Sequence, residues 1–167
     1  VTSQLKVQGS EAAARVQELS QELKKTRKDL EKALAPDLEV ELRKLEADLV
    51  ENSRDGSVVR TVVFERPGMQ TKDAQELLQR AQQKHAPMVG VVLGKAADSV
   101  AVVVSVSKEL TAEIQAGALV KELTGLMGGG GGGRPDGAQG KGKDVGKLDA
   151  AVQAARSALQ AAGLRPQ

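Results

Sequence analysis

The stretch MVGVVLGKAADSVAVVVSV, residues 88–106, carries the clearest structural signal in the chain. It contains two runs rich in β-branched valine, 88–93 and 100–106, and each run is typical of a buried β-strand. The intervening Gly94-Lys95-Ala96-Ala97-Asp98-Ser99 is short enough to connect the strands as a β-hairpin. A third run, 58–64, precedes Pro67-Gly68, and the three runs hold twelve of the twenty valines. We therefore predict a small valine-rich sheet.

Helical patterns surround these strands. Residues 71–85 have apolar side chains at helical spacing, and similar patterns cover 117–127 and 145–162. Gly128 is placed to end the middle helix and Asp144 to begin the last one. The order strand, helix, two strands, helix, loop, helix predicts an α/β domain with a mixed sheet covered by helices.

The N-terminal third has a different pattern. Residues 11–35 form an expected amphipathic helix with a heptad-like apolar seam at Val16, Leu19, Leu23 and Leu30. Pro36 interrupts the pattern, and Asp37 begins a second expected helix that reaches about Asn52. We predict an α+β chain with a helical, coiled-coil-like arm over 1–55 and a globular domain over 56–167. The seam is either the inner face of a structural arm or a homodimer interface.

Composition excludes several function classes. The 167-residue chain has no cysteine, one histidine and one aromatic residue, Phe64. A thiolate metal site, a cysteine nucleophile and base stacking on aromatic rings are excluded. No apolar run approaches the ~20 residues of a membrane span. We expect a cytoplasmic, non-catalytic piece of a longer polypeptide, without a cofactor, a metal or a membrane contact of its own, whose natural C-terminus lies near Gln167.

Glycine is concentrated in one segment. Eleven of the eighteen glycines lie within 125–146, and the region 125–167 has six basic against three acidic residues. A flexible linker needs little beyond glycine, whereas an anion-binding loop needs close backbone approach and cationic side chains. The run Gly128–Gly133 is followed by Arg134, Lys141, Lys143 and Lys147, which favours anion binding. It lacks the Gly-Lys-Ser/Thr of a P-loop.

These residues resemble a known family. Several segments of the chain are similar to the C-terminal domain of alanyl-tRNA synthetase. They are Ser105-Val-Ser-Lys108-Glu-Leu-Thr111, Ala116-Gly-Ala-Leu-Val-Lys121 and the run Gly128–Gly133 followed by Arg-Pro-Asp136, with Ala138-Gln139-Gly140, Lys143-Asp144 and Lys147-Leu148. The resemblance covers nearly the whole chain, and 57–167 resembles the globular part, which is shared with DHH-type phosphoesterases. The chain departs from the family pattern at Gly137 and at Gly140-Lys141-Gly142.

The resemblance implies a module that binds the elbow of tRNA, expected to be tRNA(Ala), and helps the aminoacylation and editing domains of the parent chain share one tRNA. ATP, magnesium and zinc would belong to the parent enzyme. A folded RNA corner is recognised by shape, phosphates and 2′-hydroxyls. The residues expected to bind tRNA are Lys121, Gly128, Gly129, Gly130, Gly131, Gly132, Gly133, Arg134, Gln139, Gly140, Lys141, Lys143 and Lys147.

Two alternatives stay open. The chain could be a purely structural dimerisation arm with a folded cap, or the substrate-binding domain of a DHH-type phosphoesterase. The second alternative requires an Asp/His metal cluster, and His85 is the only histidine. We interpret His85 as structural or solvated, near the C-terminal dipole of the 71–85 helix.

Overall fold

The computed structural model describes residues 9–33, 37–54 and 56–165, and the chain divides into two compact units between Ala35 and Pro36. In the first unit α1 (Gly9–Ala33) forms the helix predicted from the heptad-like pattern. Val16, Leu19 and Leu23 expose 66%, 48% and 72% of their surface. The seam is thus uncovered at these three positions, while the side chain of Leu30 lies outside the described residues.

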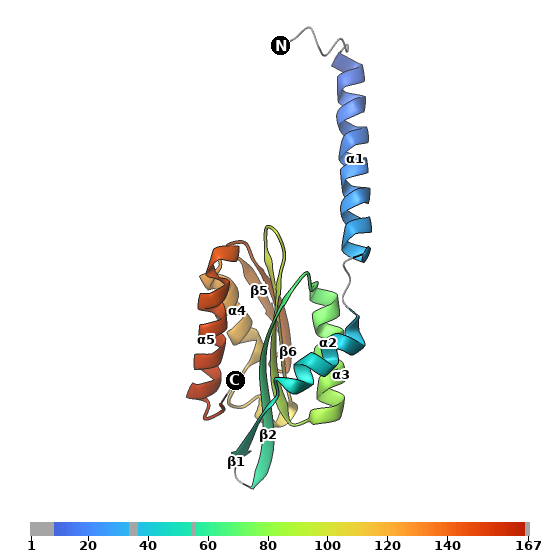
Figure 1. Cartoon of the computed structure of the whole chain (residues 1–167). Coiled ribbons are helices and arrows are strands. Elements are labelled where there is room, and N and C mark those ends of the chain that lie inside the picture. Colours follow the sequence, from blue (N-terminus) through green and yellow to red (C-terminus); the bar gives the residue numbers. More distant parts are fainter. Residues whose placement is uncertain (1–8, 34–36, 55, 166–167) are drawn as a thin grey trace. The chain divides into compact units, whose positions relative to one another are not determined.

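The second unit is built on one six-stranded sheet with the order β1-β2-β3-β4-β6-β5 (Figure 1). The strands are β1 (Val50–Arg54), β2 (Ser57–Pro67), β3 (Met88–Lys95), β4 (Val100–Val106), β5 (Gly130–Gly133) and β6 (Gly137–Gly142). β2 and β3 are parallel because α3 (Thr71–His85) connects them, and every other pair is antiparallel. The sheet is therefore mixed, as predicted, and β3 and β4 form the expected hairpin.

Helices cover both faces of the sheet. α2 (Leu38–Ala47) and α3 lie on one face, and α4 (Ala116–Leu126) and α5 (Leu148–Ala161) lie on the other (Figure 1). Each face has its own core: Leu45, Leu77 and Val92 belong to the first, and Val102, Leu123 and Leu159 to the second. Short 3₁₀ turns, Lys108–Leu110 and Val145–Lys147, precede α4 and α5.

The prediction that the second helix reaches about Asn52 is wrong. α2 stops at Ala47, and Val50–Arg54 forms β1, which pairs with β2 across the turn at Gly56, where φ is +79°. The cause is non-local: Asn52 is buried and hydrogen-bonded to Thr61 and to the backbone of Arg165.

The domain division also differs from the expected one at 55/56. Leu42 and Leu45 of α2 are buried against α3 and the sheet, so residues 37–54 belong to the α/β unit. On the same helix, Glu41 is buried and lies 2.7 Å from Arg66 of β2 and 3.0 Å from Lys44. The arm suggested by the sequence therefore keeps only its first helix.

Candidate nucleic-acid interface

The glycine-rich segment forms strands β5 and β6 instead of the predicted loop. The segment is held as strands by the β4–β6 and β5–β6 ladders, and the use of glycine in it has a steric reason: alternate glycines face α4 and leave no room for a side chain. A Cβ atom added to Gly131 would lie 2.4 Å from the Cα of Gly140 and 2.7 Å from Val120. One added to Gly140 would lie 2.7 Å from Thr124, and one on Gly142 would lie 2.6 Å from Met127. These glycines allow α4 to pack directly on the hairpin.

Both ends of the β5–β6 hairpin are tied to the domain. At its turn the amides of Val106 and Ala116 donate to the carbonyls of Asp136 and Pro135, each at 2.9 Å. At its base the amide of Gly129 donates to Thr124, and the amides of Lys143 and Asp144 donate to Met127. A flexible linker would not be held in this way. The segment is a rigid part of the sheet.

The other face of the hairpin is bare backbone bordered by polar side chains. Gln139 and Lys141 alternate with the residues that face α4, so they point away from it. Their partners across the ladder are Gly132 and Gly130. A Cβ atom added to Gly130 would meet nothing within 4 Å. Peptide groups of β5 can therefore approach a ligand closely beside an amide and an ammonium group.

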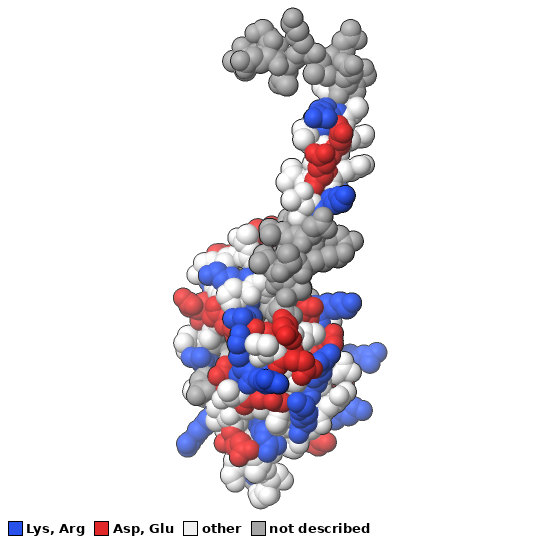
Figure 2. Space-filling model, turned by 45° about the vertical axis from the view of Figure 1, so that its right-hand side comes forward, with Lys and Arg blue, Asp and Glu red and all other residues white. Residues whose placement is uncertain are grey.

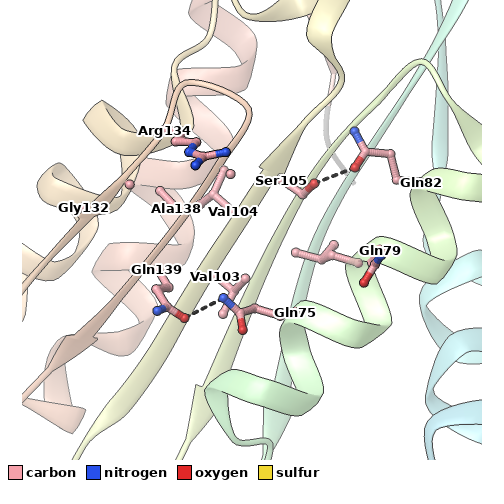
Figure 3. Close-up of a pocket in the computed structure, with 13 residues that line it drawn as sticks. Gln75, Gln79, Gln82, Val103, Val104, Ser105, Gly132, Arg134, Ala138 and Gln139 are labelled. Atoms are coloured by element: carbon pink, nitrogen blue, oxygen red, sulfur yellow. Dashed lines mark hydrogen bonds between the residues drawn. The ribbon is translucent and has the colours of Figure 1, made fainter.

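A pocket of about 520 Å³ separates this face from α3 (Figure 3). Val103 and Ser105 of β4 and Gly132, Arg134 and Gln139 of the hairpin line it together with glutamines of α3. Nε2 of Gln75 donates to Oε1 of Gln139 at 2.6 Å across the pocket, and Oγ of Ser105 donates to Gln82 at 2.9 Å.

The structure brings part of the predicted set together. Gly132, Gly133, Arg134 and Gln139 line the pocket, and Gly130 and Lys141 share the outward face of the hairpin. Lys121 of α4 reaches the edge strand, because its Cε lies 3.7 Å from the place where Gly132 would carry a Cβ.

The other members of the predicted set have different surroundings. Gly131 and Gly140 face α4, a Cβ on Gly129 would meet the carbonyl oxygen of Lys141, and Gly128 ends α4 with φ +62° as predicted. Lys143 is exposed just after β6, and Lys147 lies beyond it, 4.0 Å from Asp144. No described residue forms an ion pair with Lys121, Arg134, Lys141 or Lys143.

The helix side of the pocket was not predicted from the sequence, and it consists of Gln75, Gln79 and Gln82. Their spacing of four and three residues places them on one face of α3. The buried Ala74, Leu77, Leu78 and Ala81 lie on the face that packs on the sheet. The spacing of the three glutamines was the only sequence signal for this side of the pocket. Because their amides are uncharged, the spacing did not indicate a binding site.

The neighbouring surface over α2 and α3 carries both signs of charge (Figure 2). Arg80 contacts Glu39 and Glu76, and Glu46 lies 3.0 Å from Nε2 of His85 and 3.2 Å from Lys84. The hydrogen bond from His85, aided by Lys84, holds the pKa of Glu46 below its ordinary value. The pairs of Glu39 and Glu46 link α2 to α3, and together with Glu76 these carboxylates compensate the charges of Arg80 and Lys84.

Two further properties bear on the kind of site. Within 9–33, 37–54 and 56–165 there is no group of three His, Asp or Glu side chains that could hold a metal ion. No helix of this part of the chain is long and apolar enough to cross a membrane.

The comparison with family models places the chain: residues 55–161 match the DHHA1 domain, and the chain belongs to this family. Among curated relatives, the alanine–tRNA ligase of Trichodesmium erythraeum is 35% identical over 95% of this chain, and that of Francisella philomiragia is 34% identical over 83%. The matched regions make up 18% and 15% of these relatives, so the chain spans less than a fifth of their length.

A solved structure agrees with this result. The C-Ala domain of Aquifex aeolicus alanyl-tRNA synthetase matches with a TM-score of 0.57 and 27% identity, over 66% of this chain and 97% of that domain. The resemblance to the C-terminal domain of alanyl-tRNA synthetase, predicted from the glycine run and its neighbours, is confirmed.

Proposed function

We propose that this chain is the tRNA-binding module of an alanyl-tRNA synthetase and that the outward face of the β5–β6 hairpin contacts the tRNA. The observation that carries the proposal is the combination on one rigid surface of bare peptide backbone at Gly130 and Gly132 with Arg134, Gln139 and Lys141. We take the class of RNA, a tRNA, from the names of the relatives, which are alanine–tRNA ligases.

The chemistry of this surface suits a folded RNA. Glycine strands leave the backbone accessible to phosphates and riboses, and Arg134 and Lys141, which no described residue pairs with, offer charge to phosphate oxygens. The scarcity of aromatic side chains disfavours stacking of single-stranded bases, so recognition by shape at the tRNA elbow is the best fit.

In this proposal the module does no chemistry. It acts beside the aminoacylation and editing domains of the parent chain, which use ATP, magnesium and zinc, and it holds one tRNA(Ala) within reach of both activities. It works in the cytoplasm, where tRNA is charged.

The double variant Arg134→Ala/Lys141→Ala tests the surface. We expect it to bind an unmodified tRNA(Ala) transcript about tenfold more weakly, with a log–log salt slope smaller by about 1 to 2, because two phosphate contacts are lost. Fluorescence anisotropy over a salt series measures both quantities. Arg80→Ala/Lys84→Ala is the charge-matched control, since Arg80 pairs with Glu39 and Lys84 with Glu46, away from the hairpin. Binding equal to the wild type would contradict the proposed surface.

We further propose that α1 mediates a homodimer. The specific observation is the exposure of Val16, Leu19 and Leu23, which follow one another at three- and four-residue spacing on a single helix. Such a stripe is the narrow seam that coiled-coil helices bury against a partner.

Analytical ultracentrifugation at tens of micromolar tests the dimer. The wild-type chain is expected to sediment as a dimer and Leu19→Glu/Leu23→Glu as a monomer, because two charges would be buried in the seam. Gln17→Glu, an exposed change on the same helix, serves as the control. A monomeric wild type would exclude this interface for the chain.

A further inference from the structure

Among the residues that the structure describes, no carboxylate lines the pocket between α3 and the β5–β6 hairpin. Its polar groups are four side-chain amides, one hydroxyl and one guanidinium: Gln75, Gln79, Gln82, Gln139, Ser105 and Arg134. Its floor is apolar, with the buried Leu78 and Val103. A surface that only attracts phosphate needs donors and positive charge, whereas amides offer donors and acceptors in equal measure.

One of these amides is used for structure. Gln82 accepts a hydrogen bond from Ser105 and donates one to Ser107, whose hydroxyl in turn accepts the amide of Met88 at 2.9 Å. Both ends of the Gln82 amide are therefore occupied. These contacts hold α3 to the start of β3 and the end of β4 and fix the position of Gln82 in the pocket wall.

The remaining amides keep hydrogen-bonding capacity toward the pocket. The bond between Gln75 and Gln139 uses one end of each, which leaves the oxygen of Gln75 and the amino group of Gln139 available. The side-chain amide of Gln79 forms no hydrogen bond with any residue in the described part of the chain. The three side chains together present donors and acceptors side by side above an apolar floor (Figure 3).

Base edges and ribose hydroxyls carry the same mixture of donors and acceptors, and the faces of both rings can rest on an apolar floor. The pocket volume of about 520 Å³ lies in the range of small-ligand sites. We propose that this pocket receives a nucleoside unit of the bound RNA, and that Gln75, Gln79 and Gln139 bind its ribose and base edge. This inference rests on the proposed function and adds a neutral, non-phosphate contact to it.

Phosphate and nucleoside contacts respond differently to salt. Loss of a phosphate contact lowers the salt slope of binding, whereas loss of a neutral hydrogen bond lowers affinity equally at every salt concentration. Gln79→Met keeps the reach and bulk of the side chain and removes only its hydrogen-bonding groups. The same change at Gln153, an exposed residue of α5 on the opposite side of the sheet, is the matched control.

The experiment titrates the unmodified tRNA(Ala) transcript with the full 167-residue chain over a salt series, for Gln79→Met, Gln75→Met/Gln79→Met, Gln153→Met and Arg134→Ala/Lys141→Ala. We expect Gln79→Met to weaken binding about threefold and the double glutamine variant about tenfold, with unchanged slopes and unchanged melting temperatures. Gln153→Met should bind like the wild type.

The outcomes separate the two proposals. If the glutamine variants bind normally while Arg134→Ala/Lys141→Ala binds weakly, the nucleoside pocket is refuted and the RNA surface stands. If the glutamine variants lower the salt slope, they act on phosphate contacts and the inference is wrong. If the cationic double variant binds normally, the proposed hairpin surface itself fails.

Discussion

Gly131→Ala should destabilise the domain by about 3 kcal/mol, an overpacking cost at the upper end of those seen in protein cores. The added methyl group would lie 2.4 Å from the Cα of Gly140 and 2.7 Å from the carbonyl oxygen of Gln139 and from Val120. Two of these neighbours are backbone atoms of β6, so they can move only if the β5–β6 ladder moves with them, and Val120 can move away only with α4. Chemical unfolding of the purified chain measures the loss.

Gly130→Ala is the control for this prediction. It lies one position earlier in the same strand, and its added methyl group would meet nothing within 4 Å. Its free energy of unfolding should stay within about 0.5 kcal/mol of the wild type, as is usual for surface changes. Equal stabilities for the two variants would show that Gly131 does not lie against β6 and Val120 as described.

Asn52→Ala should cost about 3 kcal/mol, because it removes a buried group that connects three parts of the chain. Nδ2 of Asn52 donates to Thr61 at 3.1 Å and to the carbonyl of Arg165 at 3.2 Å, and Oδ1 accepts the amide of Arg165 at 2.6 Å. The variant would leave the Arg165 amide without its acceptor. Thr61 would keep its own hydrogen bond to the Arg165 carbonyl at 2.7 Å.

Thermal unfolding followed by circular dichroism measures this effect. Ser53→Ala is the matched control, since Ser53 is the next residue of β1 and is exposed. It should melt close to the wild type, while Asn52→Ala melts several degrees lower. A wild-type melting temperature for Asn52→Ala would mean that the C-terminal segment does not depend on this anchor.

The sequence predicted the elements whose signals are local. Valine runs marked β3 and β4, the apolar face marked α3, and Gly128 marked the end of α4. Strand β1 was not predicted, because Glu51-Asn52-Ser53-Arg54 has little strand propensity and is held in place by its pairing with β2. Strands β5 and β6 were not predicted for a related reason. Glycine disfavours strands, and only the contact with α4 explains why glycine occupies these positions.

The candidate site was predictable in part. Arg134, Gln139 and Lys141 lie close to the glycine run in sequence, so the local pattern found them. Gln75 and Gln79 are distant in sequence, and their proximity to Gln139 depends on the order of β4 and β6 in the sheet. Strand order is a long-range property that no pattern in the helix itself contains.

The anchors at the two ends of the β5–β6 hairpin have a thermodynamic consequence for any complex it forms. A free chain of six glycines would lose more backbone entropy on becoming ordered than any other sequence of that length. Here the hydrogen bonds to Val106, Ala116 and Met127 impose that order when the domain folds. A partner therefore meets a preorganised strand, and the free energy of each contact goes into affinity instead of into ordering the chain.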